Sequence, residues 1–437
     1  IACGCSGITV ADEGGDLSTL ATKLDFVGSG VVASGTGATK TIDSNFTAGD
    51  ATSTLDIDGT ATFAGTVGAG ILTIDGATTF SSTLTHTGLF THTTGATTVA
   101  GTYTGTGAAN LDAAITFSGN ASFNNATETL LAHTLTFNGT TLTATGTNGI
   151  ETDAATAALT LDGSSDQTVA AQITPDTTNE VVITNSNTGG TVTFNEKLGV
   201  VGGALAELID TDTSTTSVFK KEVGAVLFTV DGVATLTLDA NQATNVDINT
   251  AGTLIIDDTI TTGQEIFTVG TSVVDGSVAG TGNIQMPANL LNGETLVLIA
   301  QTADAAEAAI VADVEAAVLD TALRTYTVSN VDNGANDNDI TITAADNAAA
   351  TVASNLGTTA NIGTALIQAG IAVEGDATAL DAFSNALNAN GFSVIEDTAL
   401  AKQVAPQTDL ISGSSVAAQA VTGSIQGIMS NRMASLR

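Results

Sequence analysis

Three turns rich in aspartate hold the side chains best suited to chemistry in this sequence. They lie in the segments DIDG at 56–59, LDGSSD at 161–166 and VDNGANDND at 331–339. Carboxylate and carbonyl oxygens are the usual ligands of Ca²⁺, so we predict calcium ligands at Asp332, Asp337 and Asp339. The segment is not a complete EF-hand loop, because the twelfth position counted from Asp332 is Thr343 rather than Glu. Asp, Asn and Gly are also the ordinary residues of tight turns, and that alternative stays open.

Two histidines are close in the sequence, in the segment LTHTGLFTHTTG that contains His86 and His92. At a separation of six residues in alternating strands, they would share one face of the protein. A zinc-type site needs a third and a fourth ligand, and the sequence indicates neither. We therefore expect stacked or solvent-facing histidines, and we expect no cofactor apart from Ca²⁺.

The sequence shows no constellation typical of catalysis. Solenoid enzymes that act on polysaccharides need carboxylates clustered with Lys or Arg on one face of the solenoid. The bases are few and scattered; outside the last six residues they are Lys23, Lys40, Lys197, Lys220, Lys221, Arg324 and Lys402. The segment GSGVVASGTGATK at 28–40 lacks the ending of a phosphate-binding loop. We predict that the protein is not an enzyme.

The composition is acidic and poor in aromatic residues. The 437 residues include 45 Asp and Glu against nine Lys and Arg, which gives a net charge of −36. Nucleic acids are bound by clustered Lys and Arg, so we exclude nucleic acid as a partner. Aromatic residues make up only 4% of the chain. The apolar residues are mostly Ala, Val, Ile and Leu interleaved with Thr, which predicts a narrow interior in which large rings do not fit.

A short internal repeat is the strongest structural signal. The segment LDIDGTATFAG at 55–65 aligns with LTIDGATTFSS at 72–82, and related phrases begin at residues 114, 134, 159, 191, 228 and 253. Each phrase is a short alternating strand that ends in a turn of Gly, Asn or Asp. A period of roughly 17–20 residues is too short for a β-sandwich, and it is typical of one coil of a β-solenoid.

The predicted fold is mainly β: a parallel β-solenoid (β-helix), then a mixed α/β cap and C-terminal helices. On the order of 15 turns would stack, with Thr ladders outside and Val, Ile and Leu inside. The predicted segments are an N-terminal cap at 1–30, a solenoid rod at 31–290, a strand–helix–hairpin cap at 291–360 and a helical segment at 361–437.

Near residue 300 the pattern changes. The segment NGETLVLIAQT at 292–302 reads as a strand, and a helix follows with Asp304 as its N-cap and Glu307 as the capping partner. The apolar stripe of this helix is Ile310, Val314, Ala317 and Val318. TYTVSN and ITITAAD then flank a polar turn, which predicts a hairpin. The rest of the chain is mainly helical in pattern.

The C-terminal arrangement resembles the passenger-to-barrel junction of bacterial autotransporters. The matching segments are ALAKQVAP at 399–406 and MSNRMASLR at 429–437, and the strand at 293–301 with the hairpin at 326–342 is similar to the passenger's capping segment. The resemblance covers roughly residues 290–437. It implies a β-solenoid passenger exported through an outer-membrane barrel, which in the family follows the junction and is absent from this sequence. The alternative for the tail is a capping helix whose final cations favour the helix dipole.

The function we expect is mechanical: an extracellular structural protein of a bacterial cell surface that assembles with itself into a filament, tube or layer. A monomeric adhesin that binds a host or glycan ligand is the alternative, although two tyrosines and no tryptophan offer little for ligand recognition. A solenoid enzyme active on polysaccharides is the third hypothesis.

The terminal residues are the expected assembly interface: Cys3, Cys5, Arg432 and Arg437. The two cysteines fit an interchain disulfide, a local pair, the remnant of a lipid-attachment motif or a pair of ordered thiols, and the sequence leaves these open.

Overall fold

The computed structural model describes two compact units, Ile1–Gly232 and Val233–Arg437. The described residues are 11–12, 15–16, 32–34, 41–43, 46–47, 52–125, 129–154, 156–178, 180–199, 205–210, 214–237, 242–248, 252–268, 277–280, 282–302, 307–332 and 338–372. Within them, no helix is long and apolar enough to cross a membrane.

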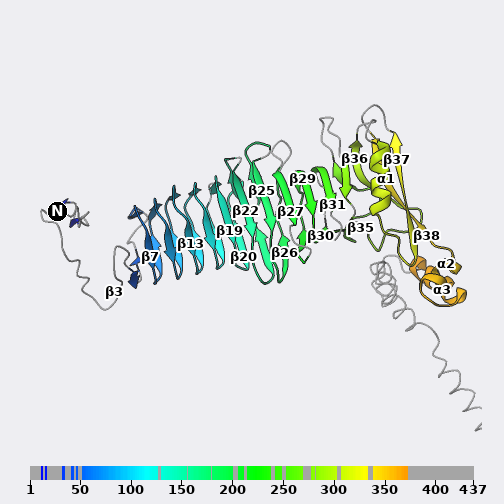
Figure 1. The fold of residues 1–437 in the computed structure, drawn as a ribbon, viewed down its shortest axis with the longest axis horizontal. Coiled ribbons are helices and arrows are strands. Elements are labelled where there is room, and N and C mark those ends of the chain that lie inside the picture. The colour runs from blue at the N-terminus through cyan, green and yellow to red at the C-terminus, as the bar shows by residue number, and fades with distance from the viewer. Residues whose placement is uncertain are drawn as a thin grey trace, which may run out of the picture. The chain divides into compact units, whose positions relative to one another are not determined.

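A parallel β-solenoid of about nine turns is the main feature of the chain, as predicted (Figure 1). In the first unit, most turns give one strand to each of three sheets. Sheet 1 runs β3 (Val32–Ser34), β4 (Thr41–Asp43), β7 (Ala61–Phe63), β10 (Thr78–Phe80), β13 (Thr97–Val99), β16 (Ile115–Phe117), β19 (Thr134–Phe137), β22 (Ala157–Leu161), β25 (Val181–Asn185), β27 (Leu205–Asp210) and β29 (Gly224–Val230).

The other two sheets run alongside in the same order of turns. Sheet 2 contains β5 (Phe46–Thr47), β8 (Val67–Ala69), β11 (Leu84–His86), β14 (Tyr103–Gly105), β17 (Ala121–Phe123), β20 (Thr141–Ala144), β23 (Gln167–Ala170), β26 (Thr191–Phe194) and β28 (Thr216–Phe219). Sheet 3 contains β6 (Thr54–Ile57), β9 (Ile71–Ile74), β12 (Phe90–His92), β15 (Ala109–Leu111), β18 (Thr129–Leu131), β21 (Ile150–Thr152) and β24 (Ile173–Pro175). Two antiparallel pairs are described in the N-terminal part of the chain: β1 (Ala11–Asp12) with β2 (Gly15–Asp16), which form a separate two-stranded sheet, and β3 with β4 at the start of sheet 1.

The length of a turn is not constant. Early in sheet 1, Ala61 pairs with Thr78, whereas further along Ile183 pairs with Leu208, so the later turn takes up more of the chain. The prediction of about 15 turns was therefore too high, because the later turns are longer than the repeat near residue 55 suggested.

Side chains alternate between the interior and the outer faces along almost every strand. In β10, for example, Thr78 and Phe80 are buried while Thr79 between them is half-buried. Alternation with period two places apolar side chains inside and leaves Thr on the outside, as the sequence predicted. The same pattern recurs in the three-residue strands of all three sheets.

The interior is wider than predicted, because large rings do fill it. The fully buried aromatic side chains are Phe80, Phe90, Tyr103, Phe117, Phe123, Phe137, Phe194, Phe219, Phe228 and Phe267. Neighbouring turns stack these rings: the ring centroids of Phe194 and Phe219 lie 4.9 Å apart with nearly parallel planes. The prediction failed because a low overall aromatic content says nothing about where the few rings are placed, and most of them point inward.

Buried amides join the turns near the end of the first unit. The side-chain N–H of Asn187 donates to Gln167 Oε1 at 2.9 Å and to the Ser165 carbonyl at 2.7 Å. Asn187 Oδ1 in turn accepts from the backbone of Gly189 and Gly190. Gln167 Nε2 donates to the carbonyls of Phe137 and Gly139. Each polar atom of these two buried amides thus has a hydrogen-bond partner, as buried polar groups need in order not to destabilise the fold.

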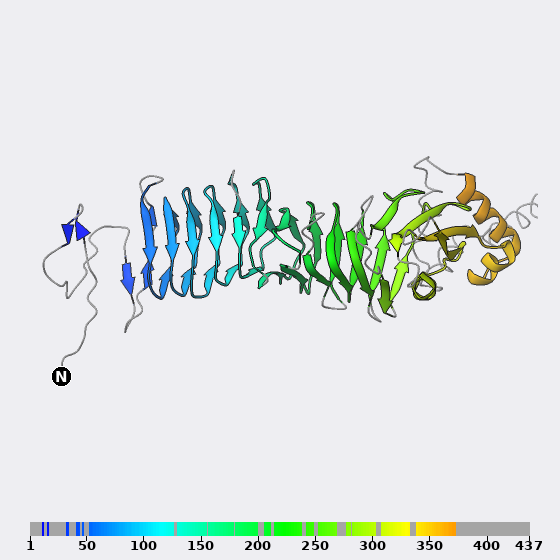
Figure 2. The same cartoon turned by 90° about the horizontal axis from the view of Figure 1, so that it is seen from above.

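The described residues of the second unit form short parallel strand pairs, a mixed sheet and helices (Figure 2). β30 (Val233–Leu236), β32 (Thr253–Ile256) and β35 (Asn283–Gln285) are parallel neighbours, as are β31 (Gln242–Ile248) and β34 (Ser277–Gly280). The mixed sheet has the order β33 (Glu265–Thr268), β36 (Thr295–Thr302), β38 (Asn338–Asp346) and β37 (Arg324–Asp332).

This unit confirms the predicted strand, helix and hairpin. β36 is the strand of NGETLVLIAQT, and β37 and β38 form the antiparallel hairpin. Helix α1 (Glu307–Ala317) buries Ile310, Val314 and Ala317 of the predicted stripe; its predicted cap Asp304 lies outside the described residues. Helices α2 (Ala349–Asn355) and α3 (Ala360–Ala372) follow.

Candidate functional site

Three exposed aspartates meet at one corner of the solenoid. Asp56 lies on β6, Asp58 follows that strand, and Asp75 follows β9 one turn later. One carboxylate oxygen from each lies within 4.8 Å of the other two. Three carboxylates at this separation are able to share a divalent cation such as Ca²⁺, with water completing its six to eight oxygen ligands.

The backbone explains why Asp58 and Asp75 approach each other. The N–H of Asp75 donates to the Ile57 carbonyl at 2.9 Å, so the two DG turns stack directly. A Cβ on Gly76 would lie 2.5 Å from the carbonyl carbon of Gly59, which leaves room only for glycine in the upper turn. Asp75 also accepts hydrogen bonds from the next turn, from the Thr93 hydroxyl to its side chain and from the Thr94 hydroxyl to its carbonyl.

The same corner carries further acids. Seven residues occupy this position, each directly after a strand of sheet 3: Asp58, Asp75, Thr93, Asp112, Ala132, Asp153 and Asp176. From Asp75 onward, each donates its backbone N–H to the last residue of the sheet 3 strand one turn before. We call these seven positions the acidic column. The corresponding positions after sheet 2 hold no acid over the turns from β8 to β23; they are Gly70, Thr87, Thr106, Asn124, Thr145 and Ala171.

The calcium ligands predicted near residue 335 are only partly described. Asp332 is exposed on β37 and Asp339 is half-buried on β38, where they pair with Asn338 and Val331 respectively. Asp337 lies outside the described residues, so a site shared by the three stays a prediction. Of the other predicted turn, Asp166 Oδ1 accepts the Thr191 N–H at 2.9 Å, which supports a structural role in the turn.

His86 and His92 are buried, so the expectation of solvent-facing histidines is wrong. The expectation that they share one face is also wrong, because the chain changes sheet between them: His86 lies on β11 in sheet 2 and His92 on β12 in sheet 3. Phe90 lies between them, with ring centroids 5.5 Å from His86 and 6.3 Å from His92. The expectation of stacked histidines is confirmed for His92, whose ring lies nearly parallel to that of Phe90, whereas the ring of His86 is tilted against Phe90 and Tyr103.

The partners of His86 fix its tautomer. Nδ1 lies 2.8 Å from the Gly88 carbonyl, which only accepts, so Nδ1 carries the proton. Nε2 lies 2.6 Å from the Tyr103 hydroxyl, which donates a hydrogen bond to it. Burial lowers the pKa of His86, partly offset by the Gly88 carbonyl, and burial raises the pKa of Tyr103 well above its usual range. Both side chains are therefore neutral at pH 7, which fits a core role rather than acid–base catalysis.

No protein-family model, curated protein or solved structure matches the chain at a significant level.

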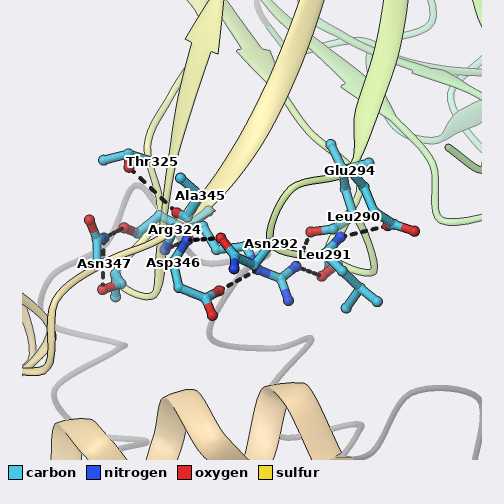
Figure 3. A network of polar contacts seen from close by, with 12 residues as sticks. Leu290, Leu291, Asn292, Glu294, Arg324, Thr325, Ala345, Asp346 and Asn347 are labelled. Atoms are coloured by element: carbon cyan, nitrogen blue, oxygen red, sulfur yellow. Dashed lines mark hydrogen bonds and ion pairs between the residues drawn. The ribbon is translucent and has the colours of Figure 1, made fainter. Parts of the chain in front are cut away.

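A buried arginine organises the second unit (Figure 3). Arg324 is 4% exposed, and its Nη1 donates to the carbonyls of Ala288, at 3.0 Å, and Leu290. Its Nε lies 3.6 Å from Asp346 Oδ1. Through these contacts the guanidinium connects the β37–β38 hairpin to the loop before β36. The backbone N–H of Asp346 makes a second connection to this loop, because it donates to Asn292 Oδ1 at 3.0 Å.

Tyr326 lies next to this network on the same strand. Its backbone N–H donates to Asp320 Oδ1 at 2.9 Å. Burial raises the pKa of Tyr326 to about 12 against the opposing field of Arg324. Among the described residues its hydroxyl has no hydrogen-bond partner. No sequence pattern singles out Arg324, because one Arg among scattered bases carries no signal of burial.

The sequence did contain the signal for Asp75. The segment LDIDG aligns with LTIDG one repeat later, and adjacent turns of a solenoid stack equivalent residues. Combining the two observations places Asp75 beside Asp58. The four predicted interface residues Cys3, Cys5, Arg432 and Arg437 lie outside the described residues, and their role stays a prediction.

Proposed function

We propose that the protein is an extracellular structural component of a Gram-negative bacterial surface, which assembles with copies of itself into a filament, tube or layer. The observation that carries the proposal is the parallel ladder of the first unit. From β6 to β24, every strand of sheet 3 pairs with the strand one turn away in one-to-one register. Such a ladder forms a backbone-bonded stack whose length is set by the number of turns.

The same ladder suggests how copies associate. An end turn of a stacked-strand rod has backbone N–H and C=O groups without a neighbouring strand, and a second copy can supply that strand. Interfaces of this kind need little side-chain chemistry. This agrees with a chain in which Thr is the commonest outward residue on the strands of sheets 1 and 2 in the first unit.

Export is proposed from the resemblance to autotransporter passengers. β36 and the β37–β38 hairpin are the segments that the resemblance assigns to the passenger cap. The two junction segments, 399–406 and 429–437, lie outside the described residues. Partnership with an outer-membrane barrel during export therefore rests on the sequence alone.

Negative-stain electron microscopy of the purified chain, with Ca²⁺ and then with a chelator, tests the proposal. We expect ordered filaments, tubes or sheets, and we expect the double variant Arg432→Ala/Arg437→Ala to lose them while Lys197→Ala, at an exposed ion pair with Glu222, keeps them. Monomers by sedimentation at every concentration, with isolated particles in both buffers, would refute self-assembly. A glycan or host-protein screen for the adhesin alternative would then be the next experiment.

A further inference from the structure

A small group of lysines lies at the corner after sheet 2, late in the first unit. Lys197 comes shortly after β26, and Lys220 and Lys221 directly follow β28 one turn later; all three are exposed. The backbone N–H of Lys220 donates to the Phe194 carbonyl at 2.9 Å, which fixes this corner on the stack. The only other Lys or Arg among the described residues is Arg324, which is buried in the second unit. Every exposed Lys or Arg that the structure describes is therefore at this one corner.

Two of the three lysines have no partner in their own chain. Lys197 Nζ lies 2.7 Å from Glu222 Oε2, in an exposed ion pair. Lys220 and Lys221 form no ion pair with any described residue, although Glu196 follows the strand one turn before. We call Lys220 and Lys221 the lysine corner. Its two ammonium groups stay available to carboxylates from outside the copy.

The far end of the acidic column carries the opposite charge. Asp153 follows β21 and Asp176 follows β24, its parallel neighbour, so the two exposed aspartates belong to consecutive turns. Glu180 adds a third carboxylate, because its Oε2 accepts the Asp176 N–H at 2.8 Å. Within the described part of the chain, no Lys or Arg forms an ion pair with these three side chains. They lie beyond the candidate cation site, which is at the start of the column.

The two surfaces lie at different corners of the same solenoid. The lysine corner follows sheet 2, whereas the acidic column follows sheet 3. A contact between them joins two copies through different patches, and each copy keeps one patch of each kind for a further neighbour. Heterologous contacts of this type repeat from copy to copy and build open assemblies unless the rotation closes a ring.

From these observations we infer that the lysine corner of one copy binds Asp153 and Asp176 of a second copy of the chain. The inference rests on the proposed self-assembly, to which it adds a side contact. Exposed ion pairs are individually weak, but complementary charges set the register of a contact and oppose wrong ones. An anionic polymer is the other ligand of matching charge. Such polymers are bound by rows of several Lys and Arg, and here two unpaired lysines lie beside Glu196 and Glu222.

Reversing the charges on the two surfaces tests the contact. The variant Lys220→Glu/Lys221→Glu has two acidic patches, and Asp153→Lys/Asp176→Lys has two basic ones. Sedimentation velocity over a concentration series at low salt measures the assembly of each variant alone and of their equimolar mixture. We expect each variant alone to need at least about tenfold more protein than the wild type in order to assemble. The mixture should assemble close to the wild-type concentration, because each variant then supplies the partner that the other lacks.

A matched pair of variants controls for net charge. Lys220→Gln/Lys221→Gln removes two positive charges, and Ser164→Glu/Ser165→Glu adds two negative charges at another exposed corner. Both variants change the net charge by the same amount, so only the first should impair assembly. Circular dichroism melts check that all four variants fold.

The outcomes separate this contact from the proposed function. Wild-type assembly that every variant retains, or a mixture that assembles no better than its components, would overturn the side contact and leave self-assembly intact. Binding to polygalacturonate or to vesicles of anionic phospholipid that Lys220→Glu/Lys221→Glu loses, with assembly unchanged, would assign the lysine corner to an anionic polymer or a membrane instead. A wild-type chain that stays monomeric at every concentration would refute self-assembly and this contact together.

Discussion

Acidification will destabilise the first unit through His86. The folded side chain is neutral because burial lowers its pKa, while in the unfolded chain the pKa returns to about 6.5. Below that value the unfolded state binds a proton that the folded state does not, so the free energy of unfolding falls as the pH falls. For a histidine that stays neutral when folded, the loss between pH 7.5 and pH 5.5 is at most about 1.4 kcal/mol.

The Tyr103 hydroxyl does not relieve this loss. Protonation of Nε2 would replace the hydrogen bond at 2.6 Å by an N–H directed at the hydroxyl oxygen, which accepts only if the hydroxyl rotates. Nδ1 already donates to Gly88. The added charge would then sit among Phe90 and Tyr103 in the interior, and a buried cation without a counter-ion is unfavourable.

Urea unfolding of the wild type and of His86→Gln at pH 7.5, 6.5 and 5.5 measures the effect. Glutamine is uncharged throughout, so the variant loses the histidine's share of the pH dependence while the carboxylates titrate in both proteins. The difference between the two slopes isolates His86, and it should reach about 1 kcal/mol over this range. His133→Gln is the control, because that side chain is exposed. Parallel pH dependences for the wild type and His86→Gln would show that the reasoning is wrong.

Three further predictions follow from the turns and the cap. Gly76→Ala should destabilise the protein by about 1–3 kcal/mol, because the new Cβ would overlap the backbone of Gly59. Gly59→Ala should be close to neutral, because a Cβ at residue 59 would have nothing within 4 Å. Thermal melts compare the two variants, and equal shifts in melting temperature would contradict the stacking of the two turns. Ca²⁺ should raise the melting temperature by an amount equivalent to about 1–3 kcal/mol. The variant Asp75→Asn should lose that rise, while the control Asp162→Asn should keep it. An unchanged response to Ca²⁺ in Asp75→Asn would exclude a site shared by Asp56, Asp58 and Asp75. Arg324→Met should lower the free energy of unfolding by about 2–4 kcal/mol, because two buried carbonyls lose their donor and Asp346 loses its ion-pair partner. Urea unfolding measures the loss, and a value below about 1 kcal/mol would mean that the network is exposed in solution.

The fold was predictable because its signal is local and repeated. The alternation of apolar residues with Thr and the DG turns near residues 58 and 75 each specify a short strand and its end. Stacking follows once the period is known. The hairpin of β37 and β38 was predictable for the same reason, since its polar turn separates two clear alternating runs.

The contacts that the sequence analysis did not predict are those between side chains of adjacent solenoid turns. His86 contacts Tyr103 in the next turn of sheet 2, and no local pattern pairs these two residues. The approach of Asp58 and Asp75 at the corner after sheet 3 was missed, although the aligned LDIDG and LTIDG segments contain its signal. Later turns are longer, as the pairing of Ile183 with Leu208 shows, so a single assumed period places distant residues on the wrong face. Arg324 reaches carbonyls that lie before β36, far earlier in the chain, and no periodic pattern encodes that contact.

The distribution of charge connects the candidate cation site to self-assembly. Stacking equivalent residues about 4.8 Å apart turns every outward position into a column, so one acidic position becomes a row of like charges that repel. The chain places five aspartates in the acidic column, while the corresponding positions after β8 to β23 of sheet 2 hold no acid. Ca²⁺ bound by the carboxylates of Asp56, Asp58 and Asp75 would offset this repulsion at one corner of the solenoid, so calcium should favour self-association of the chain and a chelator should weaken it.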